Sequence, residues 1–267
     1  MGVLNVTPDS FSDGGFYLDA VHAKRHVDEM LSAGADIIDI GGESTRPGAA
    51  PVSSDEQIAR IEHALVYAVR ERHAVVSVDT TSLDVARYAL SEGAALVNDV
   101  SCLADPAIAR VVADAEGSLV IMHARGSMSQ MRGFSDAPDD AYGDVVLDVE
   151  REWREARDRA VAQGLDRRDI VFDPGLGYMK NAEHSIELLR RLHEFRTLEA
   201  PILVGPSRKS FIAKASRSDA GPGDRLGGTI AACLAAIDGG AAMLRVHDVL
   251  AVRQAIVIHR AIGGERA

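Results

Sequence analysis

The stretch DIIDIGGESTRPG, residues 36–48, joins an apolar run to a polar, glycine-rich loop. Such a run is expected of a strand that is buried on both faces of a parallel sheet. After the loop, Ser53 and Glu56 have the spacing of a capping box, in which each side chain binds a backbone N–H at the other end. Apolar residues at helical spacing follow from Ile58 onward. The stretch therefore predicts a strand, a loop and a helix in that order.

The same unit recurs along the whole chain. Short, mostly apolar runs that suit buried strands lie at 2–6, 36–40, 74–78, 95–98, 118–122, 170–172, 202–204 and 243–246. Helical patterns separate them, and the longest, at about 144–163, has a charged outer face. Eight strands that alternate with helices, with no linker between them, favour a single closed (β/α)8 barrel domain over residues 1–267. A doubly wound open sheet is the alternative architecture.

Composition narrows the class of protein. The 267 residues carry 29 Lys and Arg against 40 Asp and Glu, and a formal net charge of −11 argues against general binding to nucleic acid. The apolar stretches are too short to cross a membrane, and the N-terminus lacks the basic segment of a secretory signal. Cys102 and Cys233 alone cannot make a disulfide framework. We expect a cytoplasmic protein whose partners are small molecules.

Each predicted strand ends in a polar or charged residue. In a (β/α)8 barrel the chemistry lies at these carboxyl ends, so the polar residues are expected to share one mouth. The residues near strand ends that are cations, or can become cations, are Arg46, Arg208, Lys209, Arg245 and His247. In a chain of negative net charge this group predicts an anion site, because arginine matches the geometry of phosphate oxygens. Ser44 and Thr45 add neutral donors.

Three acceptors follow central strands. Asp79, Asn98 and Asp173 suit a ligand that presents paired N–H groups, such as the edge of an aminopyrimidine ring. Together with the cations they predict a flat, N–H-rich ring joined to an anionic tail. Asp79 and Asp173 have an alternative interpretation as helix N-caps, which are common where a strand leads into a helix.

Other polar residues also have simpler interpretations. A surface ion pair with Asp248 or Asp238 would explain Arg245 equally well, and His247 taken singly is typical of a structural histidine. Met122 favours packing, although we also count it among the residues expected to border the substrates. The joint occurrence of these residues at strand ends, and no single residue, carries the prediction.

Two long motifs resemble the signature loops of dihydropteroate synthases. They read NVTPDSFSDGG at 5–15 and GGESTRPG at 41–48, and DPG at 173–175, SRKS at 207–210 and RVHD at 245–248 match further family motifs in the same order. The resemblance implies a TIM-type α/β barrel with its ligand site at the C-terminal ends of the strands. It also implies a transferase of folate biosynthesis that is a target of sulfonamides. In that reaction 6-hydroxymethyl-7,8-dihydropterin pyrophosphate condenses with p-aminobenzoate, giving 7,8-dihydropteroate and pyrophosphate.

The resemblance also implies roles for single residues. Asn5 matches a ligand of Mg²⁺, the expected cofactor, which lies on the pyrophosphate. The residues implied to face the pyrophosphate are Thr45, Arg46, Arg245 and His247. Those implied to hold the pterin are Asp79, Asn98, Asp173 and Lys209. Those implied near the aminobenzoate are Pro47, Tyr178 and Ser210. Because negative charge grows on the leaving pyrophosphate, the residues that we expect to be catalytic are Arg46, Lys209, Arg245 and His247.

Three positions depart from the family pattern. The family usually has a few more N-terminal residues, whereas the first predicted strand begins at residue 2. Either a neighbouring loop covers the bottom of the barrel, or further chain precedes this sequence. Met128 stands at the position of a family proline, and Tyr178 at that of a phenylalanine. The phenol of Tyr178 is expected to alter sulfonamide affinity, and none of the three departures removes a catalytic group.

Two other functions compete with this interpretation. A methyltetrahydrofolate:corrinoid methyltransferase has a related barrel but needs no pyrophosphate site, so Lys209, Arg245 and the loop at 44–46 argue against it. A non-catalytic pterin-binding paralogue has no use for Asn5 and Arg46 together with those cations. The family's barrels usually pair through helices near the C-terminus, so we expect a homodimer.

Overall fold

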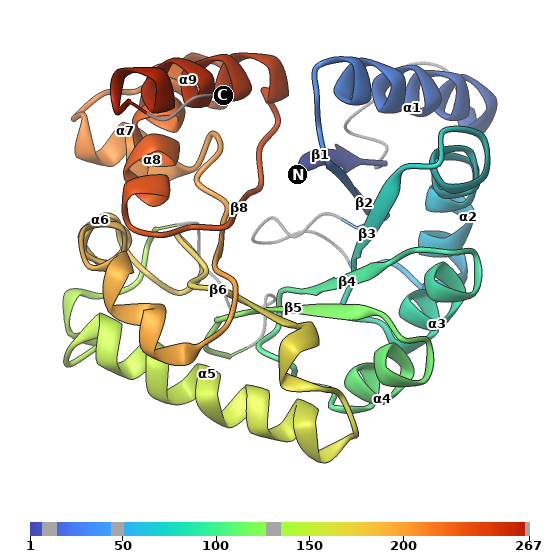
Figure 1. Ribbon diagram of the computed structural model, residues 1–267, viewed down its shortest axis with the longest axis horizontal. Helices are drawn as coiled ribbons and strands as arrows, with labels where there is room; N and C mark the ends of the chain where they lie inside the picture. The colour runs from blue at the N-terminus through green and yellow to red at the C-terminus, as the bar shows by residue number, and fades with distance from the viewer. Residues whose placement is uncertain (7–14, 44–50, 127–134, 265–267) are drawn as a thin grey trace.

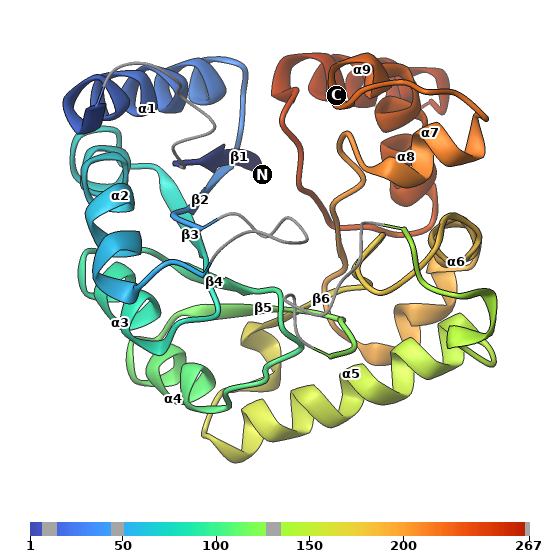
Figure 2. The same cartoon turned by 180° about the vertical axis from the view of Figure 1, so that it is seen from behind.

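The strands of the molecule form a ring at its centre, and the helices surround that ring (Figures 1 and 2). This computed structural model describes residues 1–6, 15–43, 51–126 and 135–264. The strands are β1 (Gly2–Asn5), β2 (Ile37–Gly41), β3 (Val75–Asp79), β4 (Leu96–Asp99), β5 (Ser118–Met122), β6 (Ile170–Asp173), β7 (Leu203–Val204) and β8 (Met243–Leu244). The eight predicted strands are confirmed, with their ends shifted by at most two residues.

Parallel pairing runs around the ring. Strands β1 to β6 form one continuous sheet, and β7 pairs with β8 separately. Single parallel bridges join the two sheets, from Phe172 to Ile202 on one side and from Gly2 to Val246 on the other. The backbone N–H of Val3 also donates to the carbonyl oxygen of Val246 at 3.0 Å. The ring is therefore closed, which confirms the predicted barrel and excludes the open sheet.

The helices lie in chain order around the outside of the ring (Figure 1). They are α1 (Gly15–Ser32), α2 (Ser54–Val66), α3 (Leu83–Ser91), α4 (Ala107–Asp114), α5 (Val145–Ala162), α6 (Ala182–Arg190), α7 (Ser210–Ala215), α8 (Leu226–Asp238) and α9 (Val249–Ile262). Ser53 caps α2 by accepting a hydrogen bond from the N–H of Glu56 at 3.3 Å. The cap by Ser53 is therefore confirmed. The Glu56 side chain pairs with Arg60 at 2.5 Å, and the reciprocal half of the predicted capping box is not found among the described residues.

Aromatic packing anchors α5 against the ring. The rings of Trp153 and Phe172 meet edge to face with their centres 5.1 Å apart, and Phe195 lies 4.7 Å beyond Phe172. The indole N–H of Trp153 donates to the carbonyl oxygen of Ile121 at 3.0 Å, so its one polar group is satisfied in the core. These contacts fix the ends of β5 and β6, from which residues of the candidate site extend.

Side chains of the strands fill the interior of the ring. Leu96, Val120, Val171 and Leu203 form a buried cluster, and Met1 packs against it. Three of those four residues lie at or next to the start of their strands. This cluster fills the bottom of the barrel, where the sequence predicted a covering loop as one alternative.

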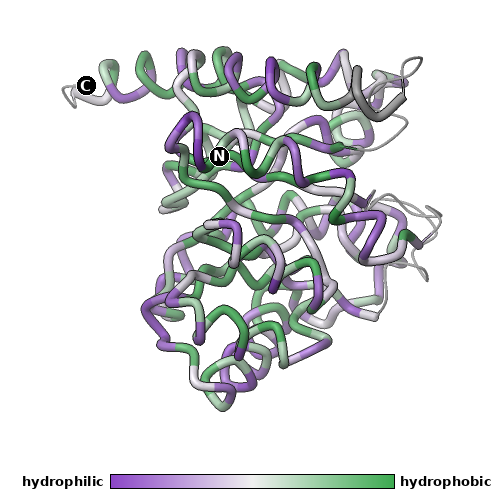
Figure 3. Tube along the Cα trace, turned by 90° about the vertical axis from the view of Figure 1, so that its right-hand side faces the viewer, coloured by the Kyte–Doolittle hydropathy of each residue, from purple (hydrophilic) through white to green (hydrophobic). Residues whose placement is uncertain are grey.

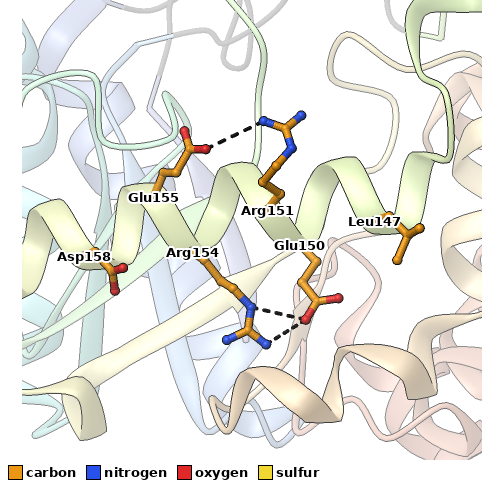
Figure 4. A pocket seen from close by; sticks show the side chains of 6 residues that line it. All are labelled: Leu147, Glu150, Arg151, Arg154, Glu155 and Asp158. Atoms are coloured by element: carbon orange, nitrogen blue, oxygen red, sulfur yellow. Dashed lines mark hydrogen bonds and ion pairs between the residues drawn. The ribbon is translucent and has the colours of Figure 1, made fainter.

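The outer face of α5 is charged, as predicted. Arg154 pairs with Glu150 at 2.7 Å and Arg151 with Glu155 at 3.6 Å along a shallow depression on the helix (Figure 4). Hydrophilic and hydrophobic residues alternate along the outer helices, including the one that leads to the C-terminus (Figure 3). In the part of the chain that the structure describes, no helix is both long and apolar enough to cross a membrane.

Candidate active site

Polar side chains converge where the strands end. Asp79 is the last residue of β3, and it pairs in register with Asn98 of β4. Asp173 ends β6, and Arg245 follows directly after β8. Asp79, Asn98 and Asp173 are buried. This is the mouth at which barrels of this type bind their ligands.

Arg245 lies between two buried carboxylates. Its Nε donates to Asp39 Oδ2 and its Nη2 donates to Asp79 Oδ2, each at 2.6 Å. The alternative of a surface pair with Asp248 or Asp238 is wrong, because those two carboxylates pair with other side chains. Burial opposes the charge of Arg245, but the two carboxylates outweigh it and raise its pKa above the ordinary value. The guanidinium therefore stays charged at the mouth of the barrel.

Several buried oxygens beside Arg245 have no hydrogen-bond partner among the described residues. They include Oδ1 of Asp39, Asp79 and Asn98. An unsatisfied buried acceptor costs about 1–3 kcal/mol, so this group indicates a place for donors that a ligand supplies. Burial raises the pKa of Asp79 to about 7 against the opposing charge of Arg245. The N-cap alternative for Asp79 is wrong, since the side chain of Ser82 caps α3.

Asp173 and Lys209 form another part of the mouth. Asp173 Oδ1 accepts a hydrogen bond at 2.7 Å from the backbone N–H two residues later, and Asn181 caps α6, so Asp173 is not a helix cap. Lys209 Nζ donates to the carbonyl oxygen of Leu176 at 2.7 Å and lies 4.8 Å from the centre of the Tyr178 ring. Burial lowers the pKa of Lys209 to about 8, and the charge of Asp173 opposes that shift. The two residues therefore support each other's ionised forms.

The loops after β7 and β8 contact each other. His247 Nδ1 and Ser207 Oγ are 3.0 Å apart. Arg208 pairs with Asp248 at 2.6 Å, so its guanidinium is directed at a carboxylate of the loop after β8. Ser210 begins α7, directly after Lys209. All four predicted cations among the described residues thus lie on the two loops that face the mouth: Arg208, Lys209, Arg245 and His247.

The other predicted site residues are placed as follows. Asn5 is the exposed last residue of β1, and its Oδ1 lies 3.6 Å from where a Cβ on Gly41 would be. Met122 ends β5 and is buried in a small cluster with Tyr178, which agrees with packing. Four residues of the second signature loop that were predicted to contact a ligand, and the departure in the fifth loop, lie outside the described residues: Ser44, Thr45, Arg46, Pro47 and Met128. Within the ranges described, no group of three or more His, Cys, Asp or Glu side chains is arranged to hold a metal ion.

Among the buried charged residues that the sequence did not predict, Asp39 and Lys180 contact residues of the site. Asp39 was not predicted because it lies inside an apolar strand and not at its end. A charged residue in such a strand was the signal that could have identified it. Lys180 is fully buried, and its Nζ lies 2.9 Å from His123 Nδ1 and donates to the carbonyl oxygen of Tyr178 at 3.2 Å. His123 Nε2 in turn lies 3.0 Å from Glu152. Lys180 thus ties the loop after β6 to the end of β5.

Comparison with known proteins agrees with this geometry. Residues 1–247 match the model of the family described as pterin binding enzyme. The chain is 43% identical over 255 residues to a dihydropteroate synthase of Synechocystis, covering 95% of this chain and 86% of that protein. A solved dihydropteroate synthase of Xanthomonas albilineans with 4-aminobenzoic acid is 39% identical, with a TM-score of 0.90. The match covers 98% of this chain and 92% of that one. One from Clostridium difficile, solved in the presence of pteroic acid, is also 39% identical, with a TM-score of 0.89. That match covers 98% of this chain and 95% of the other. The chain therefore belongs to the dihydropteroate synthase family of pterin-binding enzymes.

Proposed function

We propose that this chain condenses 6-hydroxymethyl-7,8-dihydropterin pyrophosphate with p-aminobenzoate, forming 7,8-dihydropteroate and pyrophosphate in folate biosynthesis. The observation that carries the proposal is the set of buried acceptors beside the charged Arg245 that find no partner within the described ranges. Those acceptors suit the N–H groups of a pterin, and the guanidinium suits a phosphate. Relatives solved with pteroic acid and with 4-aminobenzoic acid support the same ligand chemistry.

The pterin ring is held by the acceptors at the strand ends. Asp79 and Asn98 take ring N–H groups on their unpartnered oxygens, and Asp173 takes the aminopyrimidine edge. Lys209 lies against the Tyr178 ring and gives the pterin a cationic neighbour. As the methylene C–O bond breaks, positive charge spreads from the methylene carbon into the ring. The carboxylates stabilise that charge because they are fixed in place before the reaction.

The pyrophosphate is held by the cations of the loops. Arg245 and His247 face its oxygens, together with Thr45 and Arg46 of the second signature loop. Negative charge on the departing group grows next to Arg245, which two carboxylates keep oriented. Removing one preorganised donor of this kind typically lowers the rate about 10²–10³-fold.

Asn5 fits a Mg²⁺ ion that the substrate carries. Magnesium commonly takes only one or two protein oxygens and completes its shell with phosphate oxygens and water. A single exposed amide oxygen at the end of β1, with no carboxylate cluster among the described residues, suits that mode. When bound, the ion neutralises charge on the pyrophosphate.

The arylamine approaches the methylene carbon from the side of Met122, Tyr178 and Ser210, with Pro47 on the second signature loop. An arylamine is a weak base whose nitrogen is already neutral, so it needs positioning more than activation. The buried pair of Met122 and Tyr178 supplies an apolar wall for its ring. We assign no dedicated general base, and the proton leaves on the pyrophosphate or on a carboxylate.

The proposed reaction is tested by pyrophosphate release. The full chain is supplied with the dihydropterin pyrophosphate and Mg²⁺, with and without p-aminobenzoate. Release that requires p-aminobenzoate and yields dihydropteroate supports the proposal, and chelation of Mg²⁺ is expected to stop it. Tight binding of the pterin pyrophosphate without any release would identify a non-catalytic pterin-binding protein instead.

Affinity for the pterin is expected to rise with pH around neutrality. The pKa of Asp79 is raised to about 7 by burial, so the carboxyl is largely protonated at pH 6 and ionised at pH 8. Only the ionised form accepts on both oxygens, so that Oδ1 can take a ring N–H while Oδ2 stays with Arg245. Calorimetric titration of 6-hydroxymethylpterin between pH 5.5 and 8.5 measures this. Asp79→Asn should flatten the profile, and a wild-type affinity that falls as the pH rises through 7 would refute the expectation.

We also propose that the chain acts as a homodimer in the cytoplasm. Four large apolar side chains of α9 are exposed to solvent: Leu250, Val257, Ile258 and Ile262. A patch of this kind marks a surface that a partner covers. The thiols of Cys102 and Cys233 are free, as is usual in a reducing compartment.

Replacing Ile258 with aspartate is expected to convert the dimer to a monomer at micromolar concentration. A charge at this position cannot be buried against a second apolar surface without a large desolvation cost. Light scattering after gel filtration measures the mass. Leu147→Asp on α5, where the leucine is 58% exposed, is the matched control and should leave the dimer intact. A monomeric wild-type chain, or a dimeric Ile258→Asp variant, would show that α9 is not the interface.

A further inference from the structure

Asp39 is a buried charge in the middle of a strand. It lies between Ile38 and Ile40 in β2 and is completely buried. Its Oδ2 accepts hydrogen bonds from Arg245 Nε at 2.6 Å and from Asn98 Nδ2 at 3.2 Å. One carboxylate oxygen therefore connects β2 with β4 and with the loop after β8. Burying a carboxylate is costly unless it is paired, and the partner here is the guanidinium at the mouth.

Asp39 lies deeper in the barrel than Asp79. In the pairing of β2 with β3, Asp39 is opposite Ser77, whereas Asp79 is opposite Gly41. Two residues of a strand span about 6.6 Å, so the two carboxylates belong to successive layers. Arg245 bridges them, with Nε on the deeper carboxylate and Nη2 on the outer one.

We propose that Asp39 is a positioning residue that keeps Arg245 directed at the pyrophosphate when the pterin takes Asp79. The inference rests on the proposed function. Without a ligand, the guanidinium of Arg245 donates hydrogen bonds to both carboxylates. Once a ring N–H binds Oδ1 of Asp79, that carboxylate is shared between the pterin and Nη2, while Nε stays on Asp39. Arg245 thus keeps a buried anionic partner and its orientation, and its terminal nitrogens remain available to the phosphate oxygens.

The proposal is tested with two probes on the full chain. Inorganic pyrophosphate with Mg²⁺ reports on Arg245, and 6-hydroxymethylpterin reports on the ring pocket. Asp39→Asn keeps the shape of the side chain and removes its charge. The Kd of pyrophosphate is expected to rise about tenfold, as for a lost charge-assisted hydrogen bond, while the Kd of the pterin at pH 8 changes less than about twofold. An unchanged pyrophosphate Kd, or equal weakening of both probes, would overturn the proposal.

The pH profile of pterin binding is an independent readout. The charged groups that face Asp79 are Arg245, Asp39, Asp99, Glu43 and Lys209. Asp39→Asn removes one negative charge from this set and leaves the others, so the midpoint of the pterin titration is expected to fall. In turnover, kcat is expected to drop about tenfold while KM for the pterin pyrophosphate stays within about threefold. A midpoint that stays in place or rises contradicts the assignment.

Matched variants separate positioning from general loss of structure. Asp28 on α1 also accepts from an arginine, Arg72 at 2.9 Å, and from the hydroxyl of Tyr67, but among the outer helices. Asp28→Asn is expected to leave both Kd values unchanged. If Asp39→Asn does not fold, Asp39→Glu keeps the charge and displaces the guanidinium, so it should weaken pyrophosphate alone. Normal pyrophosphate affinity in Asp39→Glu would overturn the proposal, whereas a wild-type chain that binds both probes but forms no dihydropteroate would overturn only the proposed function.

Discussion

Replacement of Arg245 with alanine is expected to lower kcat/KM by about a thousandfold. The substitution removes the donors that face the pyrophosphate, and the loss of such a preorganised donor costs about 10²–10³ in rate. It also leaves the carboxylates of Asp39 and Asp79 buried without the guanidinium that both contact at 2.6 Å. Steady-state assays of pyrophosphate release measure the effect, and a thermal melt measures the accompanying loss of stability.

Two further variants make this result specific. Arg245→Lys keeps the charge but lacks the planar guanidinium that can bind two carboxylates and a phosphate at once. Most of the activity should therefore still be lost. Arg191 likewise joins two carboxylates, Asp144 at 2.9 Å and Glu194 at 2.7 Å, away from the mouth. Arg191→Ala should leave kcat/KM within about twofold. Equal losses in Arg191→Ala and Arg245→Ala would reduce the role of Arg245 to stability.

Replacement of Lys209 with alanine is expected to lower kcat/KM by about a hundredfold, chiefly through a higher KM for the pterin pyrophosphate. The ammonium contacts the carbonyl oxygen of Leu176 at 2.7 Å and lies against the Tyr178 ring. Burial raises the pKa of Asp173, and the charge of Lys209 is the largest influence that lowers it. Without Lys209, Asp173 is protonated more readily and accepts the pterin edge less well. Initial rates at varied pterin pyrophosphate measure KM and kcat separately.

The matched control for this variant lies on the outer helix α1. Lys24 of α1 also lies over a tyrosine ring, that of Tyr67, at 5.0 Å from the ring centre. Lys24→Ala removes the same kind of contact without touching the mouth, so its KM should equal that of the wild type. A normal KM in Lys209→Ala would remove Lys209 from the pterin site.

The barrel could be predicted because its signals are local. A buried parallel strand such as Val75–Asp79 reads as a short apolar run, and helix starts such as Ser53 carry their own cap. Strand ends were predicted less well in β8, where the chain after Leu244 is held to Met1 and Val3 by single hydrogen bonds and does not continue as a ladder. Such bonds depend on closure of the ring, which no local pattern reports.

The mouth could be predicted only in part. Asp79 and Asp173 are the last residues of their strands, so their position along the chain indicated their place in space. One of the two carboxylate partners of Arg245 did not follow from position, because Asp39 is 206 residues away and lies inside a strand. The same holds for Lys180, whose contact with His123 spans 57 residues. Charges that meet only through tertiary packing leave no spacing to recognise.

The ring is joined unevenly, and this has a consequence for its ligand. The segment of β7 and β8 is attached to the six-stranded part by one bridge on each side, and Lys209 and Arg245 lie on the loops that follow it. Asp79 and Asn98 belong to the other part. A substrate that binds all four therefore acts as a non-covalent cross-link between the two parts. At a hundredfold excess over its Kd it adds about 2.7 kcal/mol to the stability of the fold. Strands β7 and β8 pair with each other over only two residues, so few ladder hydrogen bonds protect their amide hydrogens. Without ligand, these amides are expected to exchange fastest among those of the strands.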